Sequence, residues 1–281
     1  MRRIAIQGEP GSNSHLATHE LLGEAELLPC SISVEVFERL AKSREADAAV
    51  LPVENSLHGA VADHSDLLLR YGVRIAGECS LRIRHTLMAA PGVRMENVRR
   101  VLSHPVALSQ CRRFFADNRG LEAVPFYDTA GAVKHLIETR AQDAAAIAAP
   151  FAAEVYGAEV LQSGLEDDPK NFTRFFLLVR EEDVASLRAP AAEINKMTVA
   201  FDLPHRPGSL SEALQALVPI GADLTRIESR PVPGHPWEYI FFIDLKIDSE
   251  DKADKVLEVL RERCRQVTEL GRYTSASVPG E

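Results

Sequence analysis

Short apolar runs alternate with amphipathic stretches over the first 180 residues of the chain. The apolar runs are typical of strands, and the stretches between them have the apolar spacing of helices. Strands are predicted at 2–7, 47–53, 73–81, 98–103, 144–150 and 175–179, and helices at 15–22, 34–43, 61–72, 105–118, 129–140 and 150–157. This alternation predicts an α/β domain with a largely parallel sheet, whose ligands bind beyond the carboxyl ends of the strands.

The pattern changes after residue 195. Met197, Val199, Phe201 and Leu203 alternate with polar or small residues, which predicts a strand with one apolar face. A helix stripe, two strands, a second helix and a closing strand follow, giving the order βαββαβ of a ferredoxin-like unit. We therefore predict a first domain at 1–180, a charged and alanine-rich linker at 181–195, and a second domain at 196–275.

Composition narrows the class of protein. Hydrophobic residues make up 46% of the chain and charged residues 26%, the balance of a globular protein. The net charge of −9 argues against nucleic acid or an anionic membrane surface as a general partner. No apolar run reaches the roughly 20 residues that cross a bilayer. Four widely separated cysteines indicate reduced thiols in a cytoplasmic protein.

Two clusters of polar residues follow predicted strands in the first third of the chain. Residues 7–15 contain two glycines that permit a tight turn, and Ser12 or Asn13 can cap the next helix. Residues 51–61 place Glu54, Asn55 and Ser56 at the end of a strand. Taken singly, each cluster is also typical of an ordinary capped turn. Neither has the glycine spacing of a dinucleotide site or the lysine of a P-loop, so no nucleotide cofactor is predicted.

Two further clusters complete the set. Residues 102–111 contain His104 before a proline and Gln110 within the predicted helix, and residues 170–174 place Thr173 and Arg174 directly before a buried strand. Hydroxyls, amides and one fixed cation at strand ends suit a small carboxylated ligand. His15 and His19 have a spacing that could hold a metal, but no third ligand is evident, and no metal is predicted.

With these residues in view, nearly the whole chain resembles prephenate dehydratases that carry a carboxy-terminal ACT regulatory domain. The matching motifs lie at 8–14, 52–56, 103–111, 128–130 and 171–175, with 206–210 and 227–231 in the second domain. The resemblance implies a bilobed, periplasmic-binding-protein-like catalytic domain of two α/β subdomains, with the active site in the cleft and no cofactor. It also implies a cytoplasmic homodimer or homotetramer that binds L-phenylalanine between paired ACT domains.

The family's reaction converts prephenate to phenylpyruvate, carbon dioxide and water in phenylalanine biosynthesis. Matched onto this chain, the resemblance implies catalytic roles for Thr173, Glu54, Asn55 and Gln110. It implies substrate binding by Arg174, Ser12, Ser14, Ser56, Ser103 and Asn171, and phenylalanine binding by Gly208, Ser209, Leu210, Glu228, Ser229 and Arg230.

Thr173 is expected to help the ring hydroxyl leave, and Arg174 to hold a carboxylate of the substrate. That carboxylate should be the one on the side arm, because pairing with the departing ring carboxylate would stabilise the ground state more than the transition state. An ideal strand points these two neighbours to opposite faces, so both reach the substrate only if the strand end is irregular or the cleft wraps around it.

Two alternatives stay open at this point. An arogenate dehydratase has the same chemistry on a substrate with an amino group in place of a keto oxygen, and no residue in the sequence separates the two. A non-catalytic amino-acid sensor is the alternative from a different class, because bilobed and ACT domains both bind small ligands. The Thr173 hydroxyl beside Arg174 favours an enzyme.

Overall fold

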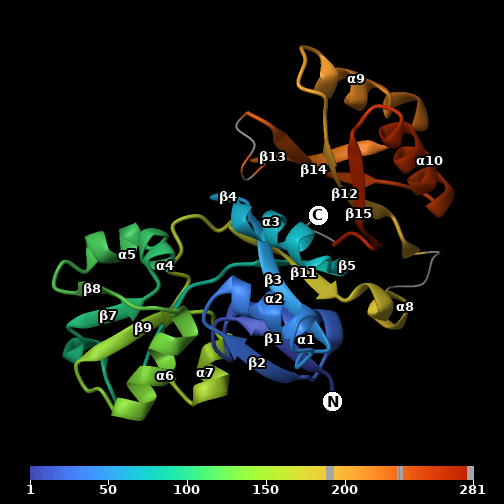
Figure 1. The fold of residues 1–281 in the computed structure, drawn as a ribbon. Coiled ribbons are helices and arrows are strands. Elements are labelled where there is room, and N and C mark those ends of the chain that lie inside the picture. The colour runs from blue at the N-terminus through green and yellow to red at the C-terminus, as the bar shows by residue number, and fades with distance from the viewer. Residues whose placement is uncertain (188–192, 233, 235–236, 277–281) are drawn as a thin grey trace.

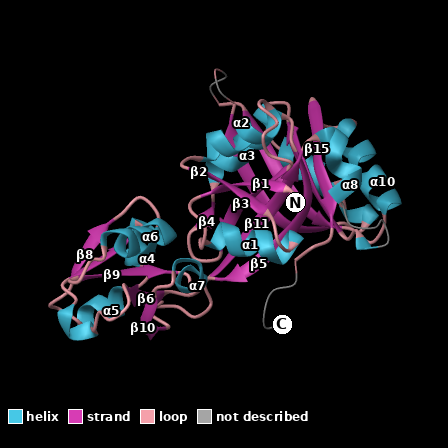
Figure 2. Cartoon of the chain, turned by 90° about the horizontal axis from the view of Figure 1, so that it is seen from below, coloured by secondary structure: helices cyan, strands magenta, loops and turns pink. Residues whose placement is uncertain are grey.

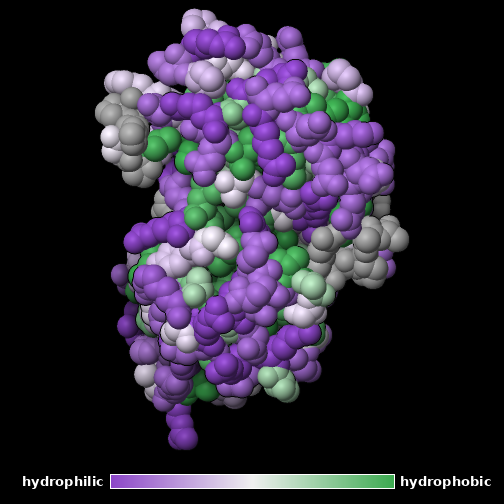
Figure 3. Space-filling model, turned by 45° about the vertical axis from the view of Figure 1, so that its right-hand side comes forward, coloured by the Kyte–Doolittle hydropathy of each residue, from purple (hydrophilic) through white to green (hydrophobic). Residues whose placement is uncertain are grey.

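The computed structural model describes residues 1–187, 193–232, 234 and 237–276 and contains three sheets, each with its own helices (Figure 1). The second lobe, with strands β6 to β10, stands apart from the rest of the chain when seen from below (Figure 2). Hydrophilic residues dominate the face shown in Figure 3, with hydrophobic residues in patches among them. Within the described residues, no helix has the length and apolar character needed to span a membrane.

The first sheet has the strand order β2-β1-β3-β11-β5, and β4 pairs with β3. β1 runs parallel to β2 and β3, whereas β11 runs antiparallel to both β3 and β5. The sheet is therefore mixed, not largely parallel as predicted, because the chain returns from the second lobe as β11 and enters from the opposite end. Its elements are β1 (Arg3–Gln7), α1 (Asn13–Leu22), β2 (Glu26–Cys30), α2 (Ser33–Ala41), β3 (Ala48–Asn55), β4 (Gly59–Ala60), α3 (Ala62–Tyr71), β5 (Arg74–Arg82) and β11 (Phe172–Val179).

The second sheet has the order β10-β6-β9-β7-β8. Alanine-rich β9 is the central strand of this sheet, pairs with β6 and β7, and is buried along its whole length. The elements are β6 (Thr86–Ala89), a 3₁₀ turn (Met95–Asn97), β7 (Arg100–Ser103), α4 (Pro105–Ser109), α5 (Arg112–Asp117), β8 (Glu122–Pro125), α6 (Thr129–Thr139), β9 (Ala144–Ala148), α7 (Phe151–Tyr156) and β10 (Glu159–Ser163).

The structure corrects two predictions in this lobe. The helix predicted at 105–118 is two helices, because the Asp167 carboxylate accepts hydrogen bonds from the backbone N–H groups of Arg112 and Arg113 and so caps a new helix start. β6, β8 and β10, like β2 in the first lobe, were not predicted. These strands are four or five residues long and show no clear alternation, and β2 and β8 each contain a proline.

The third sheet is antiparallel, with the order β13-β14-β12-β15, and its elements follow the predicted βαββαβ order. They are β12 (Lys196–Asp202), α9 (Ser209–Gln215), a 3₁₀ turn (Val218–Ile220), β13 (Asp223–Pro231), β14 (Tyr239–Lys246), α10 (Glu250–Arg261) and β15 (Gln266–Tyr273). Along the chain, a 3₁₀ turn (Glu181–Asp183) and α8 (Val184–Leu187) lie between β11 and β12. Part of the predicted linker, 188–192, lies outside the described residues.

One face of the third sheet packs on the first lobe. Phe242, Leu270 and Tyr273 belong to the same buried cluster as Ile75 and Phe176 of the first sheet. At the closest approach of β15 to β5, Gly271 lies against the backbone carbonyl of Ile75 and leaves no room for a side chain. We call this contact region between the first and third sheets the seam. Its apolar character joins the two units into one packed body.

Candidate active site

A cleft of about 500 Å³ lies between the first and second lobes. It opens at the carboxyl ends of β1, β3 and β7, the place at which α/β sheets generally bind ligands. The predicted residues Ser12, Ser14, Asn55, Gln110 and Thr173 line it. Its other lining residues are Gln7, Asn13, Pro52, His58, Gly59, Ala60, Val61, Ile83, His85, His104, Val106, Ala107, Asp128, Thr129 and Phe175.

Thr173 and Asn55 form the centre of the site. The two residues face each other across β11 and β3, and Asn55 Nδ2 donates to Thr173 Oγ1 at 2.9 Å. The orientation of the Asn55 amide is set by its oxygen, which accepts from the backbone N–H groups of Leu57 and His58 at 3.0 Å each. Because Thr173 Oγ1 already accepts a hydrogen bond, its own proton can be donated to a molecule in the cleft.

A chain of polar contacts joins this pair to the second lobe. His58 Nδ1 lies 3.1 Å from Asn55 Oδ1 and 3.3 Å from Gln110 Nε2, and Gln110 Oε1 accepts from His85 Nε2 at 2.7 Å. Two histidines that were not predicted therefore connect the predicted amides. Within the described structure, the buried His85 Nδ1 has no hydrogen-bond partner. Burial lowers the pKa of His85, which keeps its ring neutral near pH 7.

Three helices begin at the wall of the cleft. The caps of α1, α4 and α6 are Ser12, His104 and Asp128, and each cap side chain accepts from a backbone N–H further along its helix. Helix amino termini carry partial positive charge and favour bound anions. No lysine or arginine is among the described residues that line the cleft. Among the described lining residues, the groups that could favour an anion are therefore backbone N–H groups at these helix starts.

Asp128 is the one carboxylate among the described lining residues. Its Oδ1 accepts from the backbone N–H of Gly131 at 2.7 Å, while burial raises the pKa of its carboxyl group above the ordinary value. Gly8, at φ +97°, lies so close to Asp128 that a side chain at this position would collide with the carboxylate. The lack of a side chain at Gly8 therefore leaves room for the Asp128 carboxylate beside the cleft.

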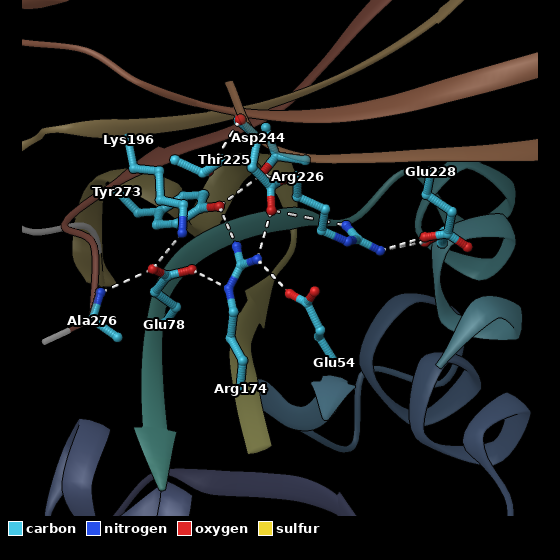
Figure 4. Close-up of polar contacts among 12 residues, drawn as sticks. Glu54, Glu78, Arg174, Lys196, Thr225, Arg226, Glu228, Asp244, Tyr273 and Ala276 are labelled. Carbon is cyan, nitrogen blue, oxygen red and sulfur yellow. Dashed lines mark hydrogen bonds and ion pairs between the residues drawn. The ribbon is translucent and has the colours of Figure 1, made fainter. Parts of the chain in front are cut away.

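The structure does not bring Arg174 to the cleft. Thr173 lines the cleft, whereas the neighbouring Arg174 contacts groups on the other side of β11. The guanidinium of Arg174 lies in the seam (Figure 4). There it pairs with Glu78 and Asp244 at 2.6 Å each and with Glu54 at 3.4 Å. Because the guanidinium is paired with these carboxylates and does not line the cleft, it does not contact a ligand bound beside Thr173. The expectation that Arg174 reaches the substrate is corrected accordingly.

Other predicted substrate-site residues support the backbone around the cleft. Ser56 donates to the carbonyl of Lys170 and accepts from Phe172 N–H, and Ser103 donates to the carbonyl of Ile147 at 2.5 Å. The buried Asn171 accepts from Asn55 Nδ2 at 2.7 Å and helps to orient that amide. Like Glu54 on the seam side, these residues do not line the cleft.

The predicted phenylalanine-binding residues are divided between two places. Ser209 and Leu210 line a hollow of about 130 Å³ in the third unit, next to Gly208, which caps α9 at φ +87°. Glu228 instead accepts from Ser65, and Arg230 pairs with Asp66 at 2.6 Å, so both side chains contact α3 of the first lobe. Ser229 is exposed on β13, an edge strand. One protomer does not bring the two groups together.

Comparison with known proteins agrees with this architecture. A family model described as prephenate dehydratase matches residues 4–183. The chain belongs to the prephenate dehydratase family. It is accordingly a dehydratase, an enzyme of the lyase class. The chain is 37% identical to a protein of Arabidopsis thaliana named arogenate dehydratase/prephenate dehydratase 2, chloroplastic, in an alignment covering 96% of this chain and 72% of that one.

Two solved structures are similar over almost the whole chain. A prephenate dehydratase from Arthrobacter aurescens in complex with L-Phe has a TM-score of 0.85 and 32% identity, covering 97% of this chain and 90% of the other. A protein described as GqqA, a novel type of quorum quenching acylase, has a TM-score of 0.86 and 34% identity, covering 98% of both chains. The family fold therefore extends through the third sheet.

The predicted cytoplasmic location is wrong by this comparison, because several of the plant relatives are named as chloroplastic proteins. The prediction relied on separated cysteines, on the lack of a long apolar run and on the family resemblance. Both properties are shared by proteins of any compartment that keeps thiols reduced, so they do not identify one compartment.

Proposed function

We propose that this member of the prephenate dehydratase family removes carbon dioxide and the ring hydroxyl from prephenate, forming phenylpyruvate. The observation that carries the proposal is the Thr173 hydroxyl, which accepts from Asn55 and can donate into a cleft walled by three helix amino termini. One oriented donor in a site that favours anions is what the reaction requires.

The chemistry explains why the cleft needs no strong base. As carbon dioxide leaves, its bonding electrons move into the ring and expel the hydroxyl, so the ring becomes aromatic. Thr173 donates a hydrogen bond to the departing oxygen as negative charge grows on it, and the hydroxide that leaves takes a proton from solvent to become water. His58 lies between this pair and the opposite wall of the cleft, and its Nδ1 donates to Asn55 in one tautomer and accepts from Gln110 in the other.

The amino termini of α1 and α4 take the anchoring role that the sequence assigned to Arg174, whereas that of α6 is already capped by the Asp128 carboxylate. A backbone dipole holds a carboxylate less tightly than a fixed guanidinium does. Weak anchoring suits the ring carboxylate, because its charge is lost in the transition state and a strong ion pair would slow the step. The side-arm carboxylate keeps its charge, so it can be held throughout the reaction.

Arogenate is a comparable substrate, and Asp128 favours it. Arogenate carries an ammonium group on the side arm, and a buried carboxylate whose pKa is raised gains most from such a partner. We expect Asp128→Asn to lower kcat/KM for arogenate by about tenfold and to change that for prephenate much less. Parallel steady-state assays on both substrates measure the ratio. An equal loss on both would mean that Asp128 supports the fold of the site and does not select between substrates.

We further propose that residues 196–275 form an ACT regulatory domain after a catalytic domain at 1–180 and a linker at 181–195. The βαββαβ order supports this assignment, as does the similarity to a dehydratase solved with L-Phe. The hollow beside Ser209 and Leu210 in one protomer would meet the β13 edge of a second protomer, which requires a homodimer or homotetramer. Calorimetry with L-phenylalanine, alongside the molar mass in solution, tests both parts; no heat and a monomeric protein would reject them.

A second candidate activity is hydrolysis of an acylated amine, because the quorum quenching acylase aligns over nearly the full chain. The cleft has apolar walls at Ile83, Val106 and Phe175 that could hold an acyl chain. Purified protein assayed on prephenate, arogenate and an N-acyl amide distinguishes the candidates. Formation of phenylpyruvate or phenylalanine supports the dehydratase, and release of a free amine alone would replace it with the acylase.

A further inference from the structure

The side of β11 that faces away from the cleft carries a buried ionic cluster. Arg174 contacts four groups: Glu54 on β3, Glu78 on β5, Asp244 on β14, and the hydroxyl of Tyr273 on β15 at 3.1 Å (Figure 4). Two of these partners belong to the first sheet and two to the third. The guanidinium therefore joins both sheets at one point.

The cluster is well buried, and its charges are matched. Its carboxylates are those of Glu54, Glu78 and Asp244. Beside Arg174, Lys196 lies 2.9 Å from Glu78 and Arg226 lies 3.9 Å from Asp244. Asp244 is 0% exposed and receives a further hydrogen bond from Thr198 at 2.7 Å. Because buried charges must be paired, loss of Arg174 would weaken the pairing of carboxylates in both sheets. Glu78 would keep Lys196, and Asp244 would keep Arg226 at 3.9 Å.

The geometry also links this cluster to the cleft. On β11 and β3, Thr173 faces Asn55 and the next pair is Arg174 with Glu54, so the cleft pair and a seam pair are consecutive along the same two strands. A shift in register follows immediately, between Arg174 and Phe175. Bulges of this kind aim side chains at specific points. A movement of Arg174 by the third sheet would therefore displace the adjacent Thr173 peptide.

We propose that Arg174 is a positioning residue that ties the third sheet to the strand carrying Thr173, so that the docking of this sheet sets the position of the Thr173 hydroxyl. The proposal rests on the proposed role of Thr173. It predicts that the third sheet affects turnover through Asp244, which lies outside the cleft and contacts Arg174 directly. A residue that merely held substrate would show no dependence on Asp244.

The test compares Asp244→Asn, Arg174→Gln and the double variant with wild type in steady-state kinetics. Each single change should lower kcat by about three- to thirtyfold with KM altered less than about twofold, and the double variant should match Arg174→Gln. Tyr273→Phe removes only a hydroxyl from the cluster and should lower kcat by a smaller factor. This variant tests the same contact if Arg174→Gln does not fold. The control is Asp66→Asn, which breaks the Arg230–Asp66 pair elsewhere in the seam and should leave kcat unchanged.

Hydrogen–deuterium exchange of β11 gives a readout that does not depend on turnover. Exchange at 172–179 should become faster in Asp244→Asn and Tyr273→Phe and stay at the wild-type rate in Asp66→Asn. If wild type consumes neither prephenate nor arogenate, the proposed function fails, while the exchange data still test the link through Arg174. Wild-type kcat and wild-type β11 exchange in Asp244→Asn would overturn the proposal, as would a rise in KM alone in Arg174→Gln.

Discussion

The two faces of β11 have opposite surroundings. On the cleft side Thr173 and Phe175 share a cavity with amides, histidines, apolar walls and the single carboxylate of Asp128, and no lysine or arginine lies among the described lining residues. On the seam side Arg174 meets three carboxylates, while Phe176 packs edge-on against Tyr273 with ring centroids 5.8 Å apart. Consecutive residues of a single strand can thus serve a reaction on one face and the attachment of another unit on the other.

The difference teaches where a fixed cation is useful. In the seam a permanent charge satisfies two buried carboxylates and specifies how the sheets dock. In the cleft the same charge would bind the ground state of a substrate that loses a carboxylate. Burial pushes the pKa of Arg174 downward, but the carboxylates of Asp244 and Glu78 outweigh it and keep the guanidinium charged. Tyr273 itself stays neutral, because burial raises the pKa of its hydroxyl.

The largest effect is expected on the cleft face, from Thr173→Val. This change keeps the shape of the side chain and removes the donor, so kcat should fall by about a hundredfold or more while KM changes little. Thr173→Ser retains a hydroxyl and is the matched control, with activity closer to wild type. Steady-state kinetics on both candidate substrates measure the effect. Full activity in Thr173→Val would remove the hydroxyl from the mechanism.

An intermediate effect is expected in the seam, from Gly271→Ala. The added methyl group would collide with the backbone carbonyl of Ile75, which cannot move aside as a flexible side chain could. The free energy of unfolding should fall by about 1–3 kcal/mol, as for other overpacked sites. Gly120→Ala is the control, because a methyl group there meets nothing within 4 Å. Denaturant unfolding of both variants measures the difference; equal stabilities would show that the seam can relax.

The smallest effect concerns the neutral His85 in the cleft. Burial lowers its pKa below the ordinary 6.5, so the unfolded chain takes up a proton at a higher pH than the folded protein does. The stability that His85 contributes is therefore present above about pH 6.5 and is lost as pH falls through the folded pKa. Each tenfold difference in proton affinity between the unfolded and folded chain corresponds to about 1.4 kcal/mol in the free energy of unfolding.

The change His85→Gln should reduce this pH dependence. Melting temperatures between about pH 7 and pH 5 should fall less steeply in the variant than in wild type. His15, whose pKa burial also lowers, retains part of the slope in both proteins. His19→Gln on the exposed face of α1 serves as the control. If melting temperature depended on pH equally in wild type and in His85→Gln, a group other than His85 would be the one that takes up the proton on unfolding.

The sequence predicted the polar clusters well and their grouping only in part. Asn55, Gln110 and Thr173 do line one cleft, because strand ends in α/β sheets meet at the same edge. His85 was missed because it follows a strand with no motif around it, and its importance comes from contact with Gln110 in the other lobe. Asp128 lay within a motif, but only the tertiary structure shows that it lines the cleft.

Local pattern by itself determined the strands and helices of the longer segments, the βαββαβ order after residue 195, and the places where polar groups gather. These follow from periodicity and turn chemistry, which act over a few residues. Tertiary structure alone decided that Thr173 faces a ligand and Arg174 faces another sheet. The pattern shows that neighbours in a strand diverge, but which face meets the cleft depends on β3, β5 and the third sheet, far away in the chain.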